Sequence, residues 1–306
     1  MTKTKVFVDG RVGTTGLRIY ERLAKREDIE LISLSEELRK NSEARKEALQ
    51  SSDISFLCLP DDAAREAVAL ADGKTRIIDT STAHRTADGW VYGFAELAGQ
   101  REKIEGAKLV ANPGCHASGF IALVKPLIDS GILDKDAALS CYSLTGYSGG
   151  GKSMIADYES EERDALLDSP KIYALGQGHK HLPEMKAICG LSYDPIFLPV
   201  VGDFYSGMLA TIPLFKKDIS GSADDIKAVY KKAYSGKVVH YEEYSDKAIY
   251  SNLYSGKDDM MIAVSGNEDK IILMACFDNL GKGASGAAIQ NMNIMMGCPE
   301  TTGLEL

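Results

Sequence analysis

The sequence predicts an α/β protein with two domains, the first built on a parallel sheet and the second an α+β domain with a mixed, mostly antiparallel sheet. Three observations support this prediction. Short apolar runs alternate with helical patterns over the first third of the 306 residues, and a glycine-rich turn follows the first of these runs. After about residue 135, strand-like runs come close together, as they do in hairpins.

The first third predicts the parallel sheet. Its strands are expected at 5–9, 29–34, 54–59, 76–79 and 108–111, and its helices at 15–25 and 63–71. Strands separated by helices need crossover connections, which give a parallel sheet with helices on both faces.

The second part predicts the antiparallel sheet. Strand-like runs lie at 208–214, 247–252, 260–264 and 271–277, and SGNED joins two of them as a hairpin would. A final helix is expected at 284–296, where the stripe that includes Met292 and Met295 is typical of core packing.

Composition narrows the class of function. A formal net charge of -9 disfavours nucleic acid and anionic membranes as partners but leaves an anionic small molecule open. No apolar run approaches the ~18 residues of a membrane span, and no signal-peptide pattern precedes the first strand. The six cysteines are dispersed without a C-x-x-C pair, which disfavours a zinc site or a disulfide framework and favours a cytoplasmic location.

The loop after the first expected strand has the spacing G-x-x-G-x-x-G, with Gly10, Gly13 and Gly16. Such a turn lets backbone N–H groups at the helix N-terminus, around Thr14 and Thr15, reach a pyrophosphate. The loop therefore indicates a Rossmann-type dinucleotide-binding domain, and a plain tight turn is the alternative.

The end of the second strand bears on the choice of nucleotide. No acidic residue stands there to bind a free ribose 2′-hydroxyl, whereas Ser35 and Arg39 or Lys40 suit a 2′-phosphate. NADP is favoured over NAD, although Glu36 and Glu37 weaken the argument.

A second glycine loop, TGYSGGGKS, fits the phosphate-binding pattern G-x-x-x-x-G-K-[ST] from Gly146. The segment that follows is mostly polar and predicts a solvated helix or a loop rather than the amphipathic helix of a nucleotide domain. We interpret the loop as part of a pocket for an anionic substrate, with Ser148 and Lys152 as contacts. The alternatives are a P-loop phosphotransferase and a flexible loop with a surface lysine.

Cys115 stands apart from the other cysteines because it lies in a turn, NPGCHASG, between an expected strand and an expected helix at 117–128. A helix N-terminus favours the thiolate, which is the nucleophilic form. Ligands of open α/β sheets also gather at the carboxyl ends of the strands.

A nucleophilic cysteine needs a proton partner. His179 and His181 alternate in GHKHLPE, and an extended backbone there would direct both imidazoles to one side. His84 and His116 remain alternatives, and His240 lies in a strand-like run. The two histidines could also bind a metal ion, but they have no convincing third ligand. Glu184 instead suits the cap or the start of the next helix.

A nicotinamide cofactor with a cysteine nucleophile indicates redox chemistry through a thioester. If phosphate is the group that leaves the acyl carbon, cations are needed nearby, and Arg85, at the end of a strand in DTSTAHR, is well placed.

These residues together resemble the N-acetyl-gamma-glutamyl-phosphate reductase family, which is related to aspartate-semialdehyde dehydrogenases. The resemblance covers nearly the whole chain and rests most specifically on ANPGCHASG, TGYSGGGKS, GHKHLPEM and DNLGKGASGAAIQNMNIMMG. WVYGFAEL departs from the pattern, because Ala95 stands where the family usually has proline. The length resembles the shorter of the family's two types.

The resemblance implies NADPH-dependent reduction of N-acetylglutamyl 5-phosphate to the semialdehyde, in arginine biosynthesis. It implies Cys115 as nucleophile, His179 and His181 in acid/base and polarising roles, and Asn279 near the nicotinamide. An NADP-binding domain is then expected at 1–114 with 284–306, and a catalytic and oligomerisation domain at 115–283, in a dimer or tetramer. A lysine-pathway reductase with a substrate one methylene longer, and a silent NADP-binding sensor, are the alternatives.

Overall fold

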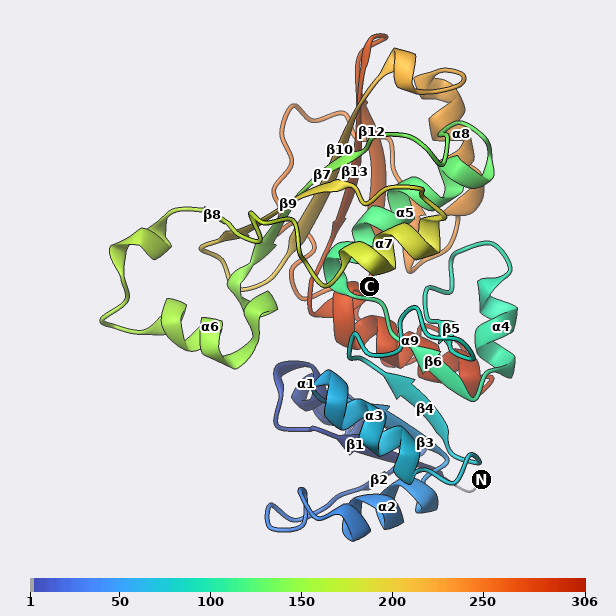
Figure 1. The fold of residues 1–306 in the computed structure, drawn as a ribbon, viewed down its shortest axis with the longest axis vertical. Helices are drawn as coiled ribbons and strands as arrows, with labels where there is room; N and C mark the ends of the chain where they lie inside the picture. The colour runs from blue at the N-terminus through green and yellow to red at the C-terminus, as the bar shows by residue number, and fades with distance from the viewer. Residues whose placement is uncertain (1–2) are drawn as a thin grey trace. The chain divides into compact units, whose positions relative to one another are not determined.

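The structure is a computed structural model that describes residues 3–306 (Figure 1). The chain folds into two compact units. Unit 1 contains the chain up to Ala95, Gly99–Pro113 and Ala284–Leu304, and unit 2 contains Glu96–Ala98, Gly114–Gly283 and Glu305–Leu306. None of the helices among residues 3–306 has the length and apolar character needed to span a bilayer.

Unit 1 is built on a six-stranded sheet in the order β2-β1-β3-β4-β6-β5, and all of its strand pairs are parallel. The strands are β1 (Thr4–Asp9), β2 (Ile29–Ile32), β3 (Ile54–Leu57), β4 (Arg76–Asp79), β5 (Val91–Tyr92) and β6 (Leu109–Ala111). The predicted parallel sheet is thus confirmed. Because the chain runs from β1 outward to β2 and then back to β3, the order reverses beside β1, where open α/β sheets bind ligands.

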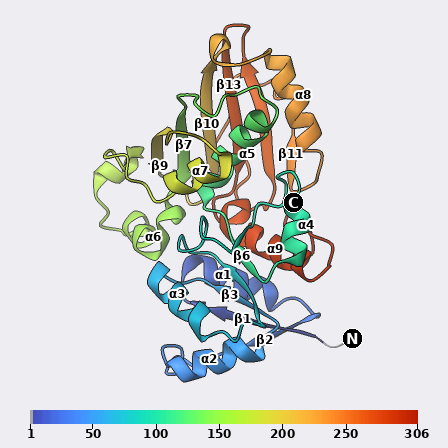
Figure 2. The ribbon, with the colours of Figure 1, turned by 45° about the vertical axis from the view of Figure 1, so that its right-hand side comes forward.

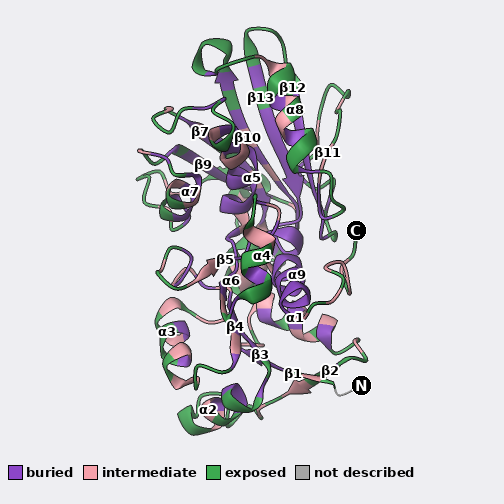
Figure 3. Ribbon diagram, turned by 90° about the vertical axis from the view of Figure 1, so that its right-hand side faces the viewer, coloured by how far each residue is buried: buried purple, intermediate pink, exposed green. Residues whose placement is uncertain are grey.

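Helices cover both faces of this sheet. They are α1 (Thr14–Leu23), α2 (Ser42–Ser51), α3 (Asp61–Leu70), α4 (Gln100–Gly106) and α9 (Gly286–Met295). Successive β1 residues point to opposite faces, so Val6 and Val8 pack in the cluster that contains α1 and α9, and Phe7 packs with α2 and α3. Met292 and Met295 of α9 belong to that core, as their spacing predicts, and the helix is buried along its length (Figure 3).

Unit 2 is built on a seven-stranded mixed sheet in the order β11-β12-β13-β10-β7-β9-β8. The strands are β7 (Ser140–Gly146), β8 (Lys171–Ile172), β9 (Ile196–Gly202), β10 (Met208–Phe215), β11 (Val239–Tyr241), β12 (Met260–Gly266) and β13 (Lys270–Phe277). Only β7–β9 and β11–β12 pair in parallel, so the sheet is mostly antiparallel, as predicted. The β12–β13 hairpin across SGNED is also confirmed.

Helices α5 (Cys115–Asp129) and α8 (Ala223–Ala233) pack on one face of this sheet (Figure 2). Helix α7 (Leu182–Cys189) packs against α5. A methyl group on Gly119 of α5 would lie 2.7 Å from Cβ of Ala210 on β10, so the absent side chain lets the helix lie directly on the strand. Helix α6 (Gly151–Glu159) buries only Tyr158, so the solvated helix predicted after the second glycine loop is present.

One predicted strand is wrong. Residues 247–252 form no strand, because Ile249 packs as part of a loop on Met261 and Met274 while the neighbouring Tyr250 is 73% exposed. The alternation of this segment reflects a loop that packs on one face of the sheet, over β12 and β13, rather than a ladder of backbone hydrogen bonds.

Candidate active site

Cys115 is the first residue of α5, at the helix start that the sequence predicts. Gly114 is the N-cap, and its N–H donates a hydrogen bond of 2.8 Å to Oε1 of Glu184, which is buried in the first turn of α7. On another side the loop after β13 approaches the cysteine, because a methyl group on Gly283 would lie 2.9 Å from Cβ of Cys115. A buried carboxylate and a glycine therefore fix the backbone that carries the half-exposed thiol.

Three imidazoles gather beside this helix start. The ring centroids of His179 and His181 are 4.8 Å apart, and each lies 5.7 Å from that of His116, the residue after the cysteine. The two later histidines do share one side, but the extended backbone expected for them is wrong at His181. That residue has helical φ and ψ as the N-cap of α7, and its N–H donates to Nδ1 of His179 at 3.2 Å.

Burial keeps two of these rings neutral near pH 7. Burial, and after it electrostatic interactions with His179 and Lys180, lower the pKa of His116 from 6.5 to about 3. Burial and the charge of Lys180 lower the pKa of His179 to about 4. Neutral imidazoles each offer one donor and one acceptor, so they can take up or deliver a proton.

The second glycine loop leads from β7 through a 3-10 turn (Tyr147–Gly150) into α6. Ser148 is 1% exposed, and its Oγ accepts a hydrogen bond of 3.0 Å from Nδ2 of Asn279. Oδ1 of Asn279 accepts from the N–H of Gly207 at 2.9 Å. Lys152 lies in the first turn of α6 with its side chain exposed. Two predicted site residues, Ser148 and Asn279, are thus in direct contact in unit 2.

The loop after β13 is held by buried polar contacts that the sequence does not reveal. Asp278 is fully buried, and its carboxylate accepts hydrogen bonds from the backbone of Leu280 and from Oγ of Ser206. Lys282 is 1% exposed at its side chain and pairs with both oxygens of Glu96, at 2.9 and 2.8 Å. These contacts hold the backbone of the segment that packs on Cys115.

The first glycine loop in unit 1 fits a dinucleotide. Gly10 has a φ of +87°, and a methyl group on it would lie 2.2 Å from the carbonyl oxygen of Cys58, at the end of β3. A methyl group on Gly16 would lie 2.5 Å from the carbonyl oxygen of Gly10. The loop therefore tolerates no side chain at either position, and it leaves the buried hydroxyl of Thr14 without a hydrogen-bond partner at the start of α1. A bare backbone and an unsatisfied hydroxyl at a helix N-terminus suit a pyrophosphate.

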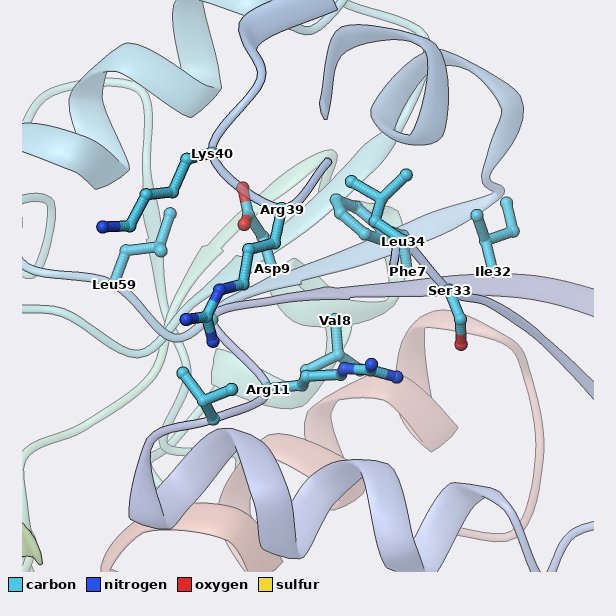
Figure 4. A pocket seen from close by; sticks show the side chains of 12 residues that line it. Phe7, Val8, Asp9, Arg11, Ile32, Ser33, Leu34, Arg39, Lys40 and Leu59 are labelled. Atoms are coloured by element: carbon cyan, nitrogen blue, oxygen red, sulfur yellow. The ribbon is translucent and has the colours of Figure 1, made fainter. Parts of the chain in front are cut away.

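A cavity of about 240 Å³ lies beside this loop, at the carboxyl ends of β1 and β2 (Figure 4). Arg11, Arg39 and Lys40 line it together with Ser33, whereas Ser35 is not among the lining residues. The carbonyl oxygen of Ser35 instead accepts from the N–H of Arg39 at 3.0 Å, which shapes the turn that carries Arg39. Three cations at the expected 2′ position suit a phosphate.

Arg85 and His84 belong to the loop after β4 in unit 1. Nε of Arg85 donates to the carbonyl oxygen of Asn112 at 3.1 Å, and Nη2 donates to that of Thr80 at 3.1 Å. Nδ1 of His84 lies 2.6 Å from Oδ2 of the fully buried Asp79, and its ring stacks on Trp90. The structure therefore gives His84 a structural partner and places the imidazole of His116, the other alternative, beside those of His179 and His181.

Sequence reasoning missed several residues that shape this site. They are Ser143, Tyr173, Glu184 as a partner of Gly114, Asp278 and the Glu96–Lys282 pair. The available signals were the acidic residue three positions after His181 and the lysine inside DNLGKG. Tyr173 and Ser143 carry no local pattern, since they meet His116 only in the folded chain.

Comparisons with known proteins identify the domains of the chain and their fold. The family model for the semialdehyde dehydrogenase dimerisation domain matches residues 115–279, and the model for the semialdehyde dehydrogenase NAD binding domain matches residues 35–107. A solved aspartate semialdehyde dehydrogenase II from Vibrio cholerae has a TM-score of 0.73 at 16% identity, covering 97% of this chain and 99% of its own. One from Candida albicans, solved with NADP, has a TM-score of 0.64 at 15% identity, covering 96% and 99%. Both show a shared fold.

Curated relatives are much more similar in sequence. An N-acetyl-gamma-glutamyl-phosphate reductase from Trichormus variabilis is 47% identical, covering 99% of this chain and 100% of its own length. One from Brucella ovis is 49% identical, covering 96% and 99%. The resemblance predicted from the motifs is confirmed, and the chain belongs to the N-acetyl-gamma-glutamyl-phosphate reductase family, with the domains of the semialdehyde dehydrogenases.

Proposed function

We propose that this chain is an NADPH-dependent oxidoreductase that converts N-acetyl-L-glutamyl 5-phosphate to N-acetyl-L-glutamate 5-semialdehyde with release of phosphate, in arginine biosynthesis. The observation that carries the proposal is near-full-length identity of 47% and 49% to reductases of that name. The local geometry supports it independently, since a half-exposed cysteine begins a helix beside three histidines.

Cys115 is the nucleophile in this mechanism. Its thiolate attacks the acyl carbon, the C–O bond to phosphate breaks, and a thioester remains on the sulfur. His179 and His181 serve the carbonyl oxygen and the proton transfers, for which a neutral His179 is suited. NADPH, held by the glycine loop of unit 1, would supply the hydride for the thioester carbon, and Cys115 would leave as the thiolate when the aldehyde forms.

The two units divide these tasks in our proposal. Unit 1 binds the cofactor through Gly10, Gly13, Thr14, Thr15 and Gly16, with Arg39 at the 2′-phosphate and Ser35 shaping its turn. Unit 2 carries the residues that act on the substrate. Its Asn279, whose side-chain amide is oriented by the hydrogen bond to Ser148, is assigned to the nicotinamide. Arg85, Ser148 and Lys152 serve the phosphate or carboxylate of the substrate.

We also propose that the enzyme is a homodimer or homotetramer that assembles through the face of the unit 2 sheet opposite α5. Side chains on that face are exposed and apolar: Tyr142 is 41%, Ile196 60%, Phe215 54% and Ile272 38% exposed. An apolar face of this kind marks an interaction surface, and the matched domain model is described as a dimerisation domain. The dispersed cysteines suit a reducing cytoplasm as the location.

The decisive experiment follows NADPH formation at 340 nm in the reverse direction, with N-acetylglutamate semialdehyde, phosphate and either NADP or NAD. We expect turnover that requires phosphate, prefers NADP and is abolished in Cys115→Ala. Turnover that persists in Cys115→Ala would refute the mechanism. Faster turnover of a semialdehyde one methylene longer would indicate the lysine-pathway reductase instead. Hydrolysis of ATP or GTP that is lost in Lys152→Ala would favour a P-loop enzyme.

A further inference from the structure

A buried ion pair includes one of the residues that line the cofactor cavity of unit 1. Asp9 is the last residue of β1, and Figure 4 shows its side chain among those that line the cavity. Nε of Arg45, in α2, donates a hydrogen bond of 3.0 Å to Oδ2 of Asp9, and Nη2 lies 3.0 Å from the same oxygen. The side chains of Arg45 and Asp9 are 7% and 6% exposed. A second carboxylate, that of Glu66, lies 3.7 Å from Nη1 of Arg45 but is mostly exposed to solvent.

The charge of Asp9 opposes the kind of ligand that the rest of the cavity favours. The other charged residues that line the cavity are Arg11, Arg39 and Lys40, which suit a 2′-phosphate. An uncompensated carboxylate among them would repel a phosphate group, which carries about −1.5 to −2 charges near pH 7. Burial raises the pKa of Asp9, and the guanidinium of Arg45 opposes this rise. Arg45, which is not among the lining residues, therefore balances a negative charge inside the cavity.

Arg45 also holds the turn that carries two of these cations. The N-cap of α2 is Asn41, which directly follows Arg39 and Lys40. The carbonyl oxygen of Asn41 accepts a hydrogen bond of 3.0 Å from the N–H of Arg45. Arg45 is thus tied through its backbone to the residue after Lys40 and through its side chain to the end of β1. The ion pair fixes the start of α2 against the strand, and with it the turn that ends at Lys40.

We propose that Arg45 determines cofactor specificity, as a positioning residue that sets the preference for NADPH over NADH through Asp9 and the turn of Arg39 and Lys40. It neutralises the carboxylate in the cavity, and it holds the two cations where they can contact the 2′-phosphate. NADH lacks this phosphate, so its affinity depends little on the ion pair. This role rests on the proposed cofactor, NADPH, and on no step of the reaction.

The test measures the dissociation constants of NADPH and NADH from their fluorescence, with the full-length protein and without substrate. We expect Arg45→Met to weaken NADPH binding roughly tenfold and to leave NADH binding nearly unchanged. Asp9→Asn should bind NADPH at least as tightly as the wild type, because the amide oxygen still accepts from Arg45 while the negative charge is gone. The double variant Asp9→Asn/Arg45→Met should recover part of the loss, since no carboxylate then opposes the phosphate.

A matched control is Arg65→Met in the same unit. Arg65 pairs with Asp62 at 3.1 Å, but both side chains are exposed, so both dissociation constants should stay at their wild-type values. A merely structural role of Arg45 would weaken both cofactors alike. A ratio of the two dissociation constants in Arg45→Met equal to that of the wild type would therefore overturn the proposal.

The double variant separates the two parts of the role. If it binds NADPH as weakly as Arg45→Met, the part assigned to the charge of Asp9 is overturned. If Arg45→Met does not fold, the double variant, which leaves no unpaired buried charge, is compared with Asp9→Asn, and equal ratios would overturn the part assigned to Arg45. A wild type that prefers NADPH but shows no phosphate-dependent turnover would refute the proposed reaction and still support the role of Arg45. A wild type that binds both cofactors equally would refute the proposed preference and this role with it.

Discussion

The buried ion pair between Lys282 and Glu96 predicts a large loss of stability when one partner is removed. Nζ of Lys282 contacts both carboxylate oxygens, and the side chains are 1% and 9% exposed. Lys282→Met removes the ammonium group that contacts both oxygens of this nearly buried carboxylate. Breaking such a pair costs roughly 3–5 kcal/mol, whereas replacing both partners with apolar residues is nearly neutral.

These values define a double-mutant cycle. Lys282→Met is expected to lose about 3–5 kcal/mol of the free energy of unfolding, and the double variant Glu96→Leu/Lys282→Met is expected to regain most of it. The loss is a large part of the roughly 5–15 kcal/mol typical of a folded protein. A matched control is Lys231→Met, because Lys231 and Glu243 also pair at 2.7 Å but are 55% and 59% exposed. Its expected cost is below about 1 kcal/mol.

Urea unfolding followed by two probes measures the effect. Far-ultraviolet circular dichroism reports both units, whereas fluorescence of the single tryptophan, Trp90, reports unit 1. We expect a lower midpoint in the dichroism transition of Lys282→Met. A loss of less than about 1 kcal/mol in Lys282→Met, or a double variant as unstable as the single one, would contradict this expectation.

Three other predictions follow. Arg39→Ala should raise the KM for NADPH about 10- to 100-fold and leave that for NADH unchanged, because a charge-assisted contact to the 2′-phosphate is lost; equal effects on both cofactors would contradict this. Gly10→Ala should abolish NADPH binding in fluorescence titrations and lower Tm, since its methyl would lie 2.2 Å from a carbonyl oxygen, while Gly73→Ala, also at positive φ but with open space, should cost only about 1–2 kcal/mol and keep binding. For His116 the folded pKa of about 3 lies below the unfolded 6.5, so its contribution to stability is complete above pH 6.5 and is lost as the pH falls toward 3. His116→Asn should flatten the pH dependence of urea unfolding in this window by up to about 1.4 kcal/mol per pH unit, and an unchanged slope would show that His116 is not buried as a neutral group.

The sequence predicts unit 1 well because its information is local. Apolar runs of strand length, a glycine loop after the first of them and helical spacing between them specify a parallel sheet without long-range detail. Cys115 is predicted for the same reason, since Pro113 and Gly114 mark the turn before its helix. The methionines of α9 repeat at helical spacing, so their place in a core also follows from the pattern.

The parts that the sequence does not predict depend on contacts between distant residues. Strand β7 contains Ser143, a polar residue that is fully buried because it meets His116 from α5. From the sequence alone Lys282 is expected to be an exposed charge. Its burial depends on an ion pair with Glu96, which is far away in the sequence. At residues 247–252 the local pattern is misleading in the other direction. Polar and apolar residues alternate there as in a strand, but the segment is a loop.

The order of residues in unit 1 has a consequence for synthesis on the ribosome. Val6 and Val8 near the amino end share a core with Ile289 and Met292 of α9. The core around the first strand is therefore complete only after α9 has been synthesised. At about 5–20 residues per second, translation of the ~280 intervening residues takes roughly 15–60 s. During that time α1 covers only part of the apolar layer of the nascent amino-terminal sheet, so chaperones can bind the rest, and a stop codon before α9 would leave that part exposed.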